Sequence, residues 1–267
     1  MTLEHTAGLD VDGLTVRFGG HVAVNLLSFK ASRGRITGLI GPNGAGKTTT
    51  FNACSGLLEP AAGRVRLDGR DVTRLGPPAR ARLGLGRTFQ RMELFASLTV
   101  AENIAVGREA GLAGASAVRQ VFRRPGERKA VAAAVDRALE VCGLTALAGR
   151  RADALSTGQR RLVELARAYA SDFSLLLLDE PSSGLDHDET DAFGEVLTGM
   201  VAERDMGLLL VEHDMALVMG ICDYLYVLDF GTLIFEGTPD EVRRSDIVRA
   251  AYLGSEAGLE EAEAGVL

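Results

Sequence analysis

A nine-residue segment limits the folds available to this chain more than any other: Gly41-Pro42-Asn43-Gly44-Ala45-Gly46-Lys47-Thr48-Thr49. The segment matches the phosphate-binding pattern G-x-x-x-x-G-K-[ST] at every fixed position. Its glycines let the backbone coil so that successive N–H groups point toward one anion. Lys47 supplies a positive charge for the β- and γ-phosphates, and the Thr48 hydroxyl can ligate Mg²⁺. The segment therefore predicts a site for a nucleoside triphosphate and Mg²⁺.

The residues on either side of this segment fit the same interpretation. Residues 35–40 are typical of a short buried strand, and residues 48–54 are typical of the start of a helix. An anion held here would lie at a helix N-terminus, where backbone N–H groups are free to bind it. A glycine-rich turn without a ligand is the alternative, and the complete pattern in this context disfavours it. The loop alone does not separate kinases, GTPases, motors and transporters.

Composition narrows the class of protein further. The 267 residues suit one large domain, or one domain with a subdomain, and the hydrophobic fraction of 46% is enough for a sizeable core. A net charge of −7 and the absence of tryptophan disfavour nucleic acid as a partner, because phosphate backbones are bound by Lys/Arg surfaces and bases by aromatic platforms. Residues 1–10 have no apolar stretch typical of a signal peptide, and the apolar runs are strand-length. We expect a soluble protein that can dock on a membrane protein, with Cys54, Cys142 and Cys222 as buried free thiols.

Strands and helices alternate along most of the chain, which predicts an α/β fold with a mainly parallel sheet flanked by helices. Residues 9–18 and 22–30 are expected to pair around Gly19-Gly20, giving an N-terminal antiparallel β region. Further strands are expected at residues 63–69, 84–90, 174–179 and 207–212, and a terminal hairpin at 224–228 and 232–236. Residues from about 94 to 170 are expected to form a helical subdomain, with Thr99 and Glu102 as a capping box. The tail, residues 255–267, is expected to be loose.

Two carboxylates follow the apolar run Leu175–Leu178. Asp179 can hold Mg²⁺, and Glu180 can polarise an attacking water as a general base. The alternative is a pair of solvated acids at the end of a strand.

Three weaker candidates and one aromatic residue accompany them. Residues 155–159, Leu-Ser-Thr-Gly-Gln, open an amphipathic helix, so Ser156 is either a helix cap or part of an anion site for a nucleotide bound by another subunit. Gln90 could contact Mg²⁺ or water. His213 could hydrogen-bond a γ-phosphate at the mouth of a parallel sheet, where ligands bind. Phe18 could stack on an adenine ring or pack in the core.

The joint order of these features resembles the ATP-binding cassette (ABC) ATPase family over about residues 9–254. In that family's terms the Walker A loop is at 41–48, the Q-loop at Gln90, the signature at 155–159, the Walker B strand at 175–179, the D-loop at 183–186 and the switch histidine at His213. Phe18 falls where the family places its adenine-stacking aromatic residue. The resemblance implies a P-loop NTPase fold with ATP and Mg²⁺ as cofactors.

The resemblance also implies roles for individual residues. Glu180, His213 and Gln90 would be catalytic, and Thr48, Gln90 and Asp179 would hold the metal. The nucleotide would be bound by Phe18, Gly41, Pro42, Asn43, Gly44, Ala45, Gly46, Lys47, Thr48, Thr49, Ser156, Thr157, Gly158, Gln159 and Asp186. One position departs from the family, because its signature usually has glycine where this chain has Thr157. Threonine tolerates fewer backbone conformations than glycine, and we expect Ser156 and Gly158 to preserve the contact.

A narrower resemblance is carried by four segments: 86–90, 212–220, 235–239 and 251–254. They are similar to the ATP-binding subunits of branched-chain amino acid importers, and also to cassettes for urea or short-chain amides and for lipopolysaccharide export. The implied partners are transmembrane permease subunits, a second cassette of the same or a paralogous chain and, indirectly, a substrate-binding protein. The implied location is cytoplasmic, on the inner face of the membrane.

Two further alternatives carry less weight. A soluble cassette ATPase acting on DNA or ribosomes is disfavoured by the net charge, by the single cassette and by the lack of a long coiled-coil insertion. A non-hydrolysing ATP-binding regulator is disfavoured because both Glu180 and His213 are present.

Overall fold

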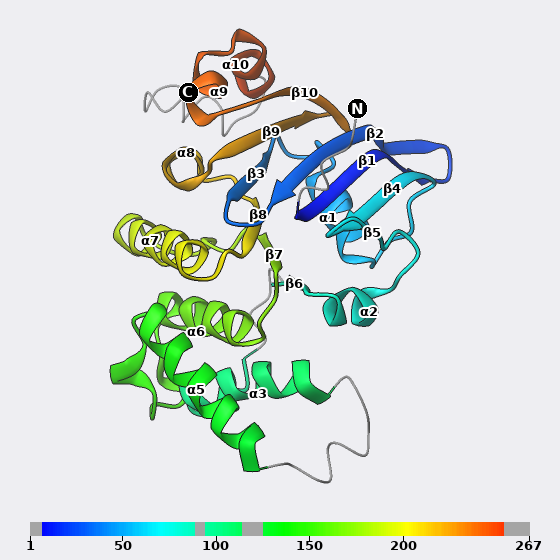
Figure 1. The fold of residues 1–267 in the computed structure, drawn as a ribbon. Coiled ribbons are helices and arrows are strands. Elements are labelled where there is room, and N and C mark those ends of the chain that lie inside the picture. The colour runs from blue at the N-terminus through cyan, green and yellow to red at the C-terminus, as the bar shows by residue number, and fades with distance from the viewer. Residues whose placement is uncertain (1–6, 89–93, 114–124, 254–267) are drawn as a thin grey trace.

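The computed structural model describes residues 7–88, 94–113 and 125–253, and these form two sheets and several helices (Figure 1). The first sheet is antiparallel and has the strand order β2-β1-β4-β5. Its strands are β1 (Gly8–Phe18), β2 (His21–Ser32), β4 (Ala62–Leu67) and β5 (Arg70–Asp71). Strands β1 and β2 pair around Gly19-Gly20, as the sequence predicts.

The second sheet has the order β10-β9-β3-β8-β7-β6, and all neighbouring strands in it run parallel except β10 and β9. Its strands are β3 (Ile36–Ile40), β6 (Leu85–Arg87), β7 (Leu175–Asp179), β8 (Gly207–Val211), β9 (Tyr224–Asp229) and β10 (Thr232–Gly237). The α-helices are α1 (Lys47–Ser55), α2 (Pro77–Arg82), α3 (Val100–Ala113), α5 (Pro125–Val141), α6 (Thr157–Ala170), α7 (His187–Arg204), α8 (Met215–Ile221), α9 (Pro239–Arg244) and α10 (Asp246–Leu253). Two 3₁₀ helices, η1 (Thr145–Leu147) and η2 (Ala152–Ala154), lie between α5 and α6.

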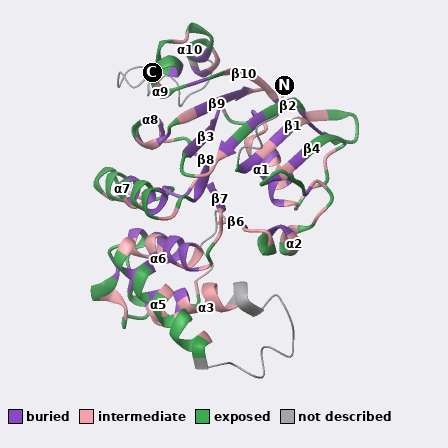
Figure 2. Cartoon of the chain, viewed as in Figure 1, coloured by how far each residue is buried: buried purple, intermediate pink, exposed green. Residues whose placement is uncertain are grey.

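Alternate residues of the central strands face two different hydrophobic cores. Leu176 and Leu178 of β7 pack with the core that includes α5, α6 and α7. Leu175 and Leu177 pack with the antiparallel sheet and α1. Side chains of a strand point alternately to its two faces, so a run of apolar residues is what a strand covered on both faces requires. Figure 2 shows this burial along the strands of the parallel sheet, with exposed residues on the outer sides of the helices.

Helix α1 is held at its C-terminal end by a buried arginine. Arg80 of α2 is 1% exposed, and its Nη1 donates hydrogen bonds to the carbonyls of Ala53 and Cys54 at 2.7 and 2.5 Å. Cations at a helix C-terminus satisfy its unpaired carbonyls and oppose the negative end of its dipole. Because residue 47 begins the same helix, Arg80 steadies the element that carries the phosphate loop at its other end.

Helices α3, α5 and α6 pack on one another and form what we call the α3–α5–α6 group. The group lies below the parallel sheet in Figure 1, on the side away from α9 and α10. The predicted capping box at the start of α3 is present: Glu102 N donates to Thr99 Oγ1 at 3.2 Å, and Thr99 N donates to Glu102 Oε2 at 2.8 Å.

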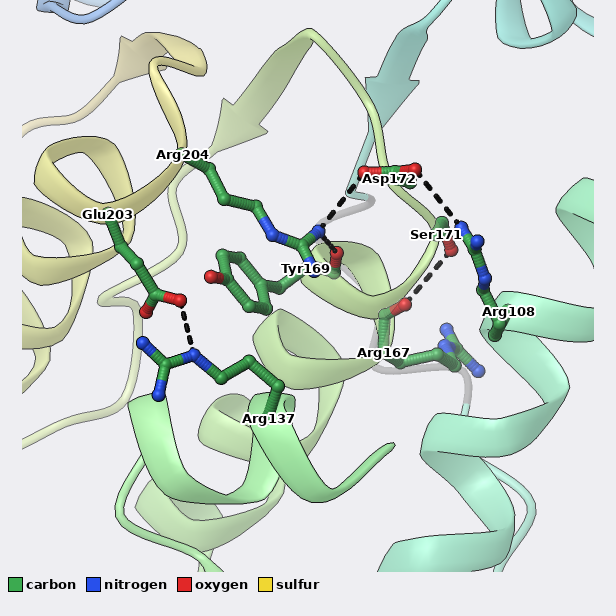
Figure 3. Close-up of polar contacts among 8 residues, drawn as sticks. All are labelled: Arg108, Arg137, Arg167, Tyr169, Ser171, Asp172, Glu203 and Arg204. Carbon is green, nitrogen blue, oxygen red and sulfur yellow. Dashed lines mark hydrogen bonds and ion pairs between the residues drawn. The ribbon is translucent and has the colours of Figure 1, made fainter. Parts of the chain in front are cut away.

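Charged side chains join this group to the end of α7 (Figure 3). Asp172, just after α6, accepts from Arg108 of α3 and from Arg204 of α7, each at 3.3 Å. Arg204 also donates to the Tyr169 carbonyl at 2.9 Å and lies 4.1 Å from the centre of the Tyr169 ring. Arg137 of α5 pairs with Glu203 of α7. We call these contacts the α7 junction.

Several sequence predictions need correction. The hairpin of β9 and β10 is present but is not terminal, because α9 and α10 follow it. Helices α2 and α8 were not predicted either, so the sequence analysis missed four helices: α2, α8, α9 and α10. These four helices have six to eight residues, too few for a clear periodic pattern, although Thr238 and Glu241 form a capping box that marks α9. The strand predicted at 84–90 is limited to β6 in the described residues. The tail, residues 255–267, lies outside them.

Two remaining predictions concern the burial of the cysteines and the length of the apolar segments. All three cysteines are buried and free, as predicted. Within the described ranges, no helix combines the length and hydropathy needed to cross a bilayer.

Candidate functional site

The phosphate loop joins β3 to α1 and depends on glycine at two positions. Gly41 and Gly46 have φ angles of 147° and 96°, in the region that L-residues rarely adopt. A Cβ at Gly41 would lie 2.0 Å from the Leu228 carbonyl oxygen, and one at Gly46 would lie 2.8 Å from that of Ala23. Neighbouring backbone therefore fills the space that a side chain would need. The loop can follow this path only with glycine at both positions.

Lys47 lies at the start of α1 with its amine turned back toward the loop. Its Nζ donates to the carbonyl oxygens of Gly41 and Pro42 at 2.5 and 3.0 Å. Burial lowers the pKa of Lys47, and the nearby charges of Glu180 and Asp179 partly oppose this shift. The two carboxylates predicted from β7 are thus close enough to act electrostatically on the phosphate-loop lysine.

Asp179 ends β7 in a buried position and pairs with Arg87 of β6. Its Oδ2 accepts from Arg87 Nη2 at 2.8 Å, while its buried Oδ1 has no hydrogen-bond partner. Burial raises the pKa of Asp179, and the Arg87 guanidinium works in the opposite direction. Arg87 also donates to Asn52 Oδ1 and Ser55 Oγ of α1, at 2.7 and 2.9 Å.

The residues present fit a bound Mg²⁺. A buried carboxylate oxygen without a partner is costly unless a cation or donor satisfies it. Mg²⁺ prefers oxygen ligands and is usually held by one or two carboxylates together with substrate phosphates. Asp179 and the Thr48 hydroxyl are ligands of this type. Within the described residues there is no cluster of three or more His, Cys, Asp or Glu side chains that could hold a metal ion.

Glu180 follows Asp179 and faces the same space as the phosphate loop. A cavity of about 370 Å³ is lined by His21, Val22, Ala23, Asn43, Gly44, Ala45, Gly46, Lys47, Thr48, Thr49, Glu180 and Phe230. Glu180 has a φ of 48°, which is uncommon for a residue with a side chain. Its N–H donates to the Val211 carbonyl at 2.8 Å. The structure thus brings the predicted general base and the predicted phosphate loop into one cavity.

The predicted signature residues, 155–159, lie at the start of α6 and, unlike Glu180, do not line the phosphate cavity. Ser156 caps α6, accepting from the Gln159 N–H at 3.2 Å, and Gln159 Oε1 accepts from the Ser156 N–H at 3.1 Å. Thr157 is the first residue of the helix and is not among the residues with positive φ, so its backbone does not need glycine. Gly158 lies against the carboxylate of Glu189: a Cβ added to Gly158 would lie 2.5 Å from Glu189 Oε1. None of residues 155–159 lines the phosphate cavity of its own chain.

Asp186, Phe18 and His213 are not among the residues that line this cavity. Asp186 caps α7 by accepting from the Glu189 N–H at 2.8 Å. Phe18 ends β1 with 52% of its surface exposed and is not part of the cavity lining. The side chain of His213 is 63% exposed. Gln90 lies outside the described residues.

Three contributors to the site were not identified from the sequence. Arg87 holds Asp179 and α1 together, and the sequence showed it only as a basic residue inside the strand predicted at 84–90. Phe230, which is 87% exposed with a φ of 41°, lines the phosphate cavity from the turn between β9 and β10. Glu212 is 1% exposed and binds the Ser182 N–H and hydroxyl at 2.8 and 2.7 Å. A single acidic residue before His213 gave no indication of this burial.

Comparison with known proteins gives a consistent result. The family model described as "ABC transporter" matches residues 24–183, and the model "Branched-chain amino acid ATP-binding cassette transporter" matches residues 232–258. The chain is 40% identical over 249 residues to the high-affinity branched-chain amino acid transport ATP-binding protein BraF of Pseudomonas aeruginosa, covering 92% of this chain and 97% of that protein. It is 41% identical over the same length to the corresponding protein LivG of Salmonella typhimurium, with the same coverage.

More distant relatives share the same overall length. The lipopolysaccharide export system ATP-binding protein LptB of Haemophilus influenzae is 32% identical over 251 residues, covering 94% of this chain and 99% of that protein. A crystal structure of an ATP-binding cassette of an ABC transporter, in its ADP conformation, has a TM-score of 0.81 and 30% identity, covering 93% of this chain and 99% of that one.

Proposed function

Because this chain belongs to the ABC transporter family and is one of its ATP-binding cassettes, we propose that it powers the import of branched-chain amino acids. Cassettes of this family are ATPases, and the chain is an ATPase of that class. The finer proposal is the transported substrate and the direction of transport.

One observation carries the substrate proposal. The chain is 40–41% identical along almost its full length to two cassettes named for branched-chain amino acid transport, against 32% for the lipopolysaccharide export cassette. The match of residues 232–258 to the branched-chain amino acid cassette model supports the same assignment. The segment matched by that model begins at β10 and includes α9 and α10.

We assign the following roles within the phosphate cavity. The N–H groups of residues 41–49 and the Lys47 amine bind the phosphates. Asp179, Thr48 and Gln90 would hold Mg²⁺, which would supply positive charge to the β- and γ-phosphates. Glu180 accepts a proton from the attacking water, and His213 donates a hydrogen bond to the γ-phosphate. Phe18 stacks on the adenine.

A complete site in this proposal needs two cassettes. Residues 155–159 do not line the cavity of their own chain, while Ser156 and the first turn of α6 present N–H groups at a helix N-terminus. Ser156, Thr157, Gly158, Gln159 and Asp186 would therefore bind the nucleotide held by the phosphate loop of the other cassette. ATP then favours the closed pair because it contacts both chains only in that state.

The permease subunits are proposed to dock beside β6 and the α3–α5–α6 group, which we take as the helical subdomain at about residues 94–170. An apolar pocket of about 280 Å³ lies between α2 and β6, lined in part by Leu57, Pro77, Pro78, Leu85 and Phe173. Leu57 is 53% exposed. Apolar surface next to the strand that leads to Gln90 suits a helix of a membrane partner. The proposal places the chain on the inner face of the membrane, with a substrate-binding protein acting indirectly.

The experiment is to purify this chain by affinity tag from detergent-solubilised membranes of its own organism and identify the proteins recovered with it. We expect two permease subunits and a second cassette. A labelled leucine uptake assay on cells lacking this chain should then show loss of uptake, restored by the wild-type gene.

Each other outcome has a defined meaning. Recovery with lipopolysaccharide export components, with leucine uptake intact, would overturn the substrate proposal and leave the ATPase assignment. Recovery with ribosomes or nucleic acid and no membrane protein would overturn the transport proposal.

A further inference from the structure

The guanidinium of Arg87 connects Asp179, the carboxylate proposed to hold Mg²⁺, to helix α1. Its Nη2 donates to Asp179 Oδ2 at 2.8 Å, and its Nη1 donates to Asn52 Oδ1 at 2.7 Å and to Ser55 Oγ at 2.9 Å. The side chains of Arg87 and Asp179 are 10% and 3% exposed. One buried side chain therefore contacts the end of β7 and two positions on one face of the helix that follows the phosphate loop.

Both ends of the Arg87 side chain are held by the protein. Strands β6 and β7 run parallel with Arg87 opposite Leu177, and the N–H of Thr88 donates to the Leu177 carbonyl at 2.9 Å. At the other end, the guanidinium carbon lies 5.8 Å from the centre of the Phe51 ring on α1, within the range of a cation–π contact. Asp179 therefore receives a hydrogen-bond donor whose position is set by the sheet and by α1.

This donor makes the two oxygens of Asp179 unequal. Oδ2 accepts from the guanidinium, whereas the buried Oδ1 has no hydrogen-bond partner. The torsion that turns a carboxylate has broad, roughly two-fold preferences, so the side chain alone does not fix its plane. With Oδ2 held by Arg87, the carboxylate has a defined orientation, and Oδ1 is the oxygen left for a cation.

Arginine suits this role better than lysine does. Its guanidinium is planar and presents several donors in a fixed fork, so it can bind a carboxylate on one side and other acceptors on another side. Carboxylates that bind metals are usually hydrogen-bonded themselves, and loss of such a neighbour typically lowers metal affinity by about 10- to 100-fold. The contacts of Arg87 with Asp179 and α1 have this form.

From these contacts we propose that Arg87 is a positioning residue for the metal: it holds Asp179 by Oδ2, so that Oδ1 is presented to the Mg²⁺ that accompanies the nucleotide. The inference rests on the proposed nucleotide site and adds one residue to it. Arg87 carries a positive charge and is not itself a ligand. Its loss should therefore weaken the binding of the metal and leave the contacts of the phosphate loop with the nucleotide in place.

The first test measures metal binding without turnover. Mn²⁺, which takes the same oxygen ligands as Mg²⁺, is titrated into the purified chain and followed by EPR, with the chain in excess over ADP so that the nucleotide is bound. In Arg87→Met the Kd of Mn²⁺ should rise by about 10- to 100-fold. The affinity for ADP in EDTA should stay close to that of the wild type. Unchanged Mn²⁺ affinity in folded Arg87→Met would overturn the proposal.

Two further variants separate the metal ligand from the support of α1. Arg80→Met is the matched control, because Arg80 is also buried and its hydrogen bonds, in the part of the chain that the structure describes, go to main-chain carbonyls. It should lower the Tm and leave the Kd of Mn²⁺ unchanged. Arg87→Lys, which keeps the charge and loses the fork, should give an intermediate Kd. Equal weakening in Arg80→Met and Arg87→Met would mean that Arg87 acts only through α1, against the proposal.

The second test uses the ATPase activity of the assembled transporter at varied Mg²⁺. In Arg87→Met the Mg²⁺ concentration that gives half the maximal rate should rise by about 10- to 100-fold. Saturating Mg²⁺ should restore most of kcat, because the ligand is still present and only its orientation is lost. A fall in kcat that Mg²⁺ does not restore would indicate a merely structural role and contradict the inference.

A crystal structure of the wild-type chain with ADP and Mg²⁺ decides the question even if the variants do not fold. We expect Arg87 Nη2 within hydrogen-bond distance of Asp179 Oδ2, and Oδ1 on the side of the metal. A guanidinium turned away from Asp179 in that structure would overturn the proposal. A wild-type chain that binds no ADP would instead contradict the proposed function, and the inference with it.

Discussion

The phosphate loop and the α7 junction hold their parts together in opposite ways. At the loop, backbone meets backbone: glycines at 41 and 46 allow contacts that no side chain would permit. At the junction, long charged side chains span the space between helices, and Asp172, at the centre, has 62% of its side chain exposed. Backbone contacts leave one arrangement, whereas exposed ion pairs contribute about 0–1 kcal/mol each and weaken in salt.

The difference indicates which part of the molecule is able to move. The loop that binds phosphate is held by β3 before it and by α1 after it, and Arg80 secures the far end of α1. The α3–α5–α6 group shares a buried hydrophobic core with α7, and at the edge of that core the two are also joined by Asp172, Arg204 and the pair of Arg137 with Glu203. Because these ion pairs are exposed and weak, we expect them to break more readily than the backbone contacts that hold the phosphate loop.

The largest expected effect concerns Glu180. Glu180→Gln should lower ATP turnover of the assembled transporter by about 10³-fold, because the amide cannot accept the proton of the attacking water. ATP binding should persist, and an ATP-bound pair of cassettes should accumulate on gel filtration. Glu195→Gln is the control for the loss of an acid. Normal hydrolysis by Glu180→Gln would remove Glu180 from the role of base.

Lys47→Ala should weaken ATP binding by about 100-fold, because a charge-assisted contact to the phosphates is lost. Titration calorimetry on the purified chain measures this directly. Lys30→Ala, which removes an exposed lysine on β2, is the matched control and should bind ATP as the wild type does. Equal affinity for Lys47→Ala and the control would mean that the loop is not the phosphate site.

Labelling of two buried thiols, one in each region, shows in a single experiment how strongly ATP protects each region from opening. Burial raises the pKa of Cys54 and of Cys142 to about 12, so at pH 8 both are protonated and react only when the structure opens. Cys54 lies on α1 and Cys142 follows α5. In single-cysteine variants treated with a thiol reagent, ATP at about ten times its Kd should slow labelling of Cys54 about tenfold. Labelling of Cys142 should change much less, because α5 can open without α1.

Equal protection of both thiols by ATP would contradict the separation of the two regions, since it would mean that α1 and α5 open together. Raising the pH increases the thiolate fraction of an opened cysteine. Comparison of the two sites must therefore be made at one pH.

The smallest effect is expected at the α7 junction. Asp172→Asn keeps a residue that tolerates the φ of 64° found here and removes the charge that pairs with Arg108 and Arg204. The Tm should fall by about 1–4 °C, and the loss should shrink in high salt. Asp136→Asn, an exposed acid on α5, is the control. A loss of ATP affinity in Asp172→Asn as large as in Lys47→Ala would contradict the comparison.

The sequence predicted the parts of the molecule that depend on local pattern. The phosphate loop, all the described strands except β5, and the caps at Thr99 and Ser156 follow from glycine spacing, apolar runs and capping residues. Their physical causes lie within a few neighbouring residues. For this reason single positions of the loop, such as Lys47, could be placed from the sequence alone.

Contacts between distant segments could not be predicted in the same way. The pairing of Arg87 with Asp179 joins residues 92 positions apart, and that of Glu212 with Ser182 spans 30 positions. Each is set by the register of neighbouring strands, which no local pattern encodes. The short helices α2, α8, α9 and α10 were missed because their length gives little periodicity.

The central claim is that ATP bound at the phosphate loop of this chain drives amino acid import. The most direct measurement is uptake of labelled leucine by proteoliposomes that contain the complete transporter, with ATP enclosed on the side of the cassettes and the substrate-binding protein on the other. We predict uptake that requires ATP and falls at least about tenfold with Glu180→Gln. Uptake that is independent of ATP, or equal in wild type and Glu180→Gln, would contradict the account.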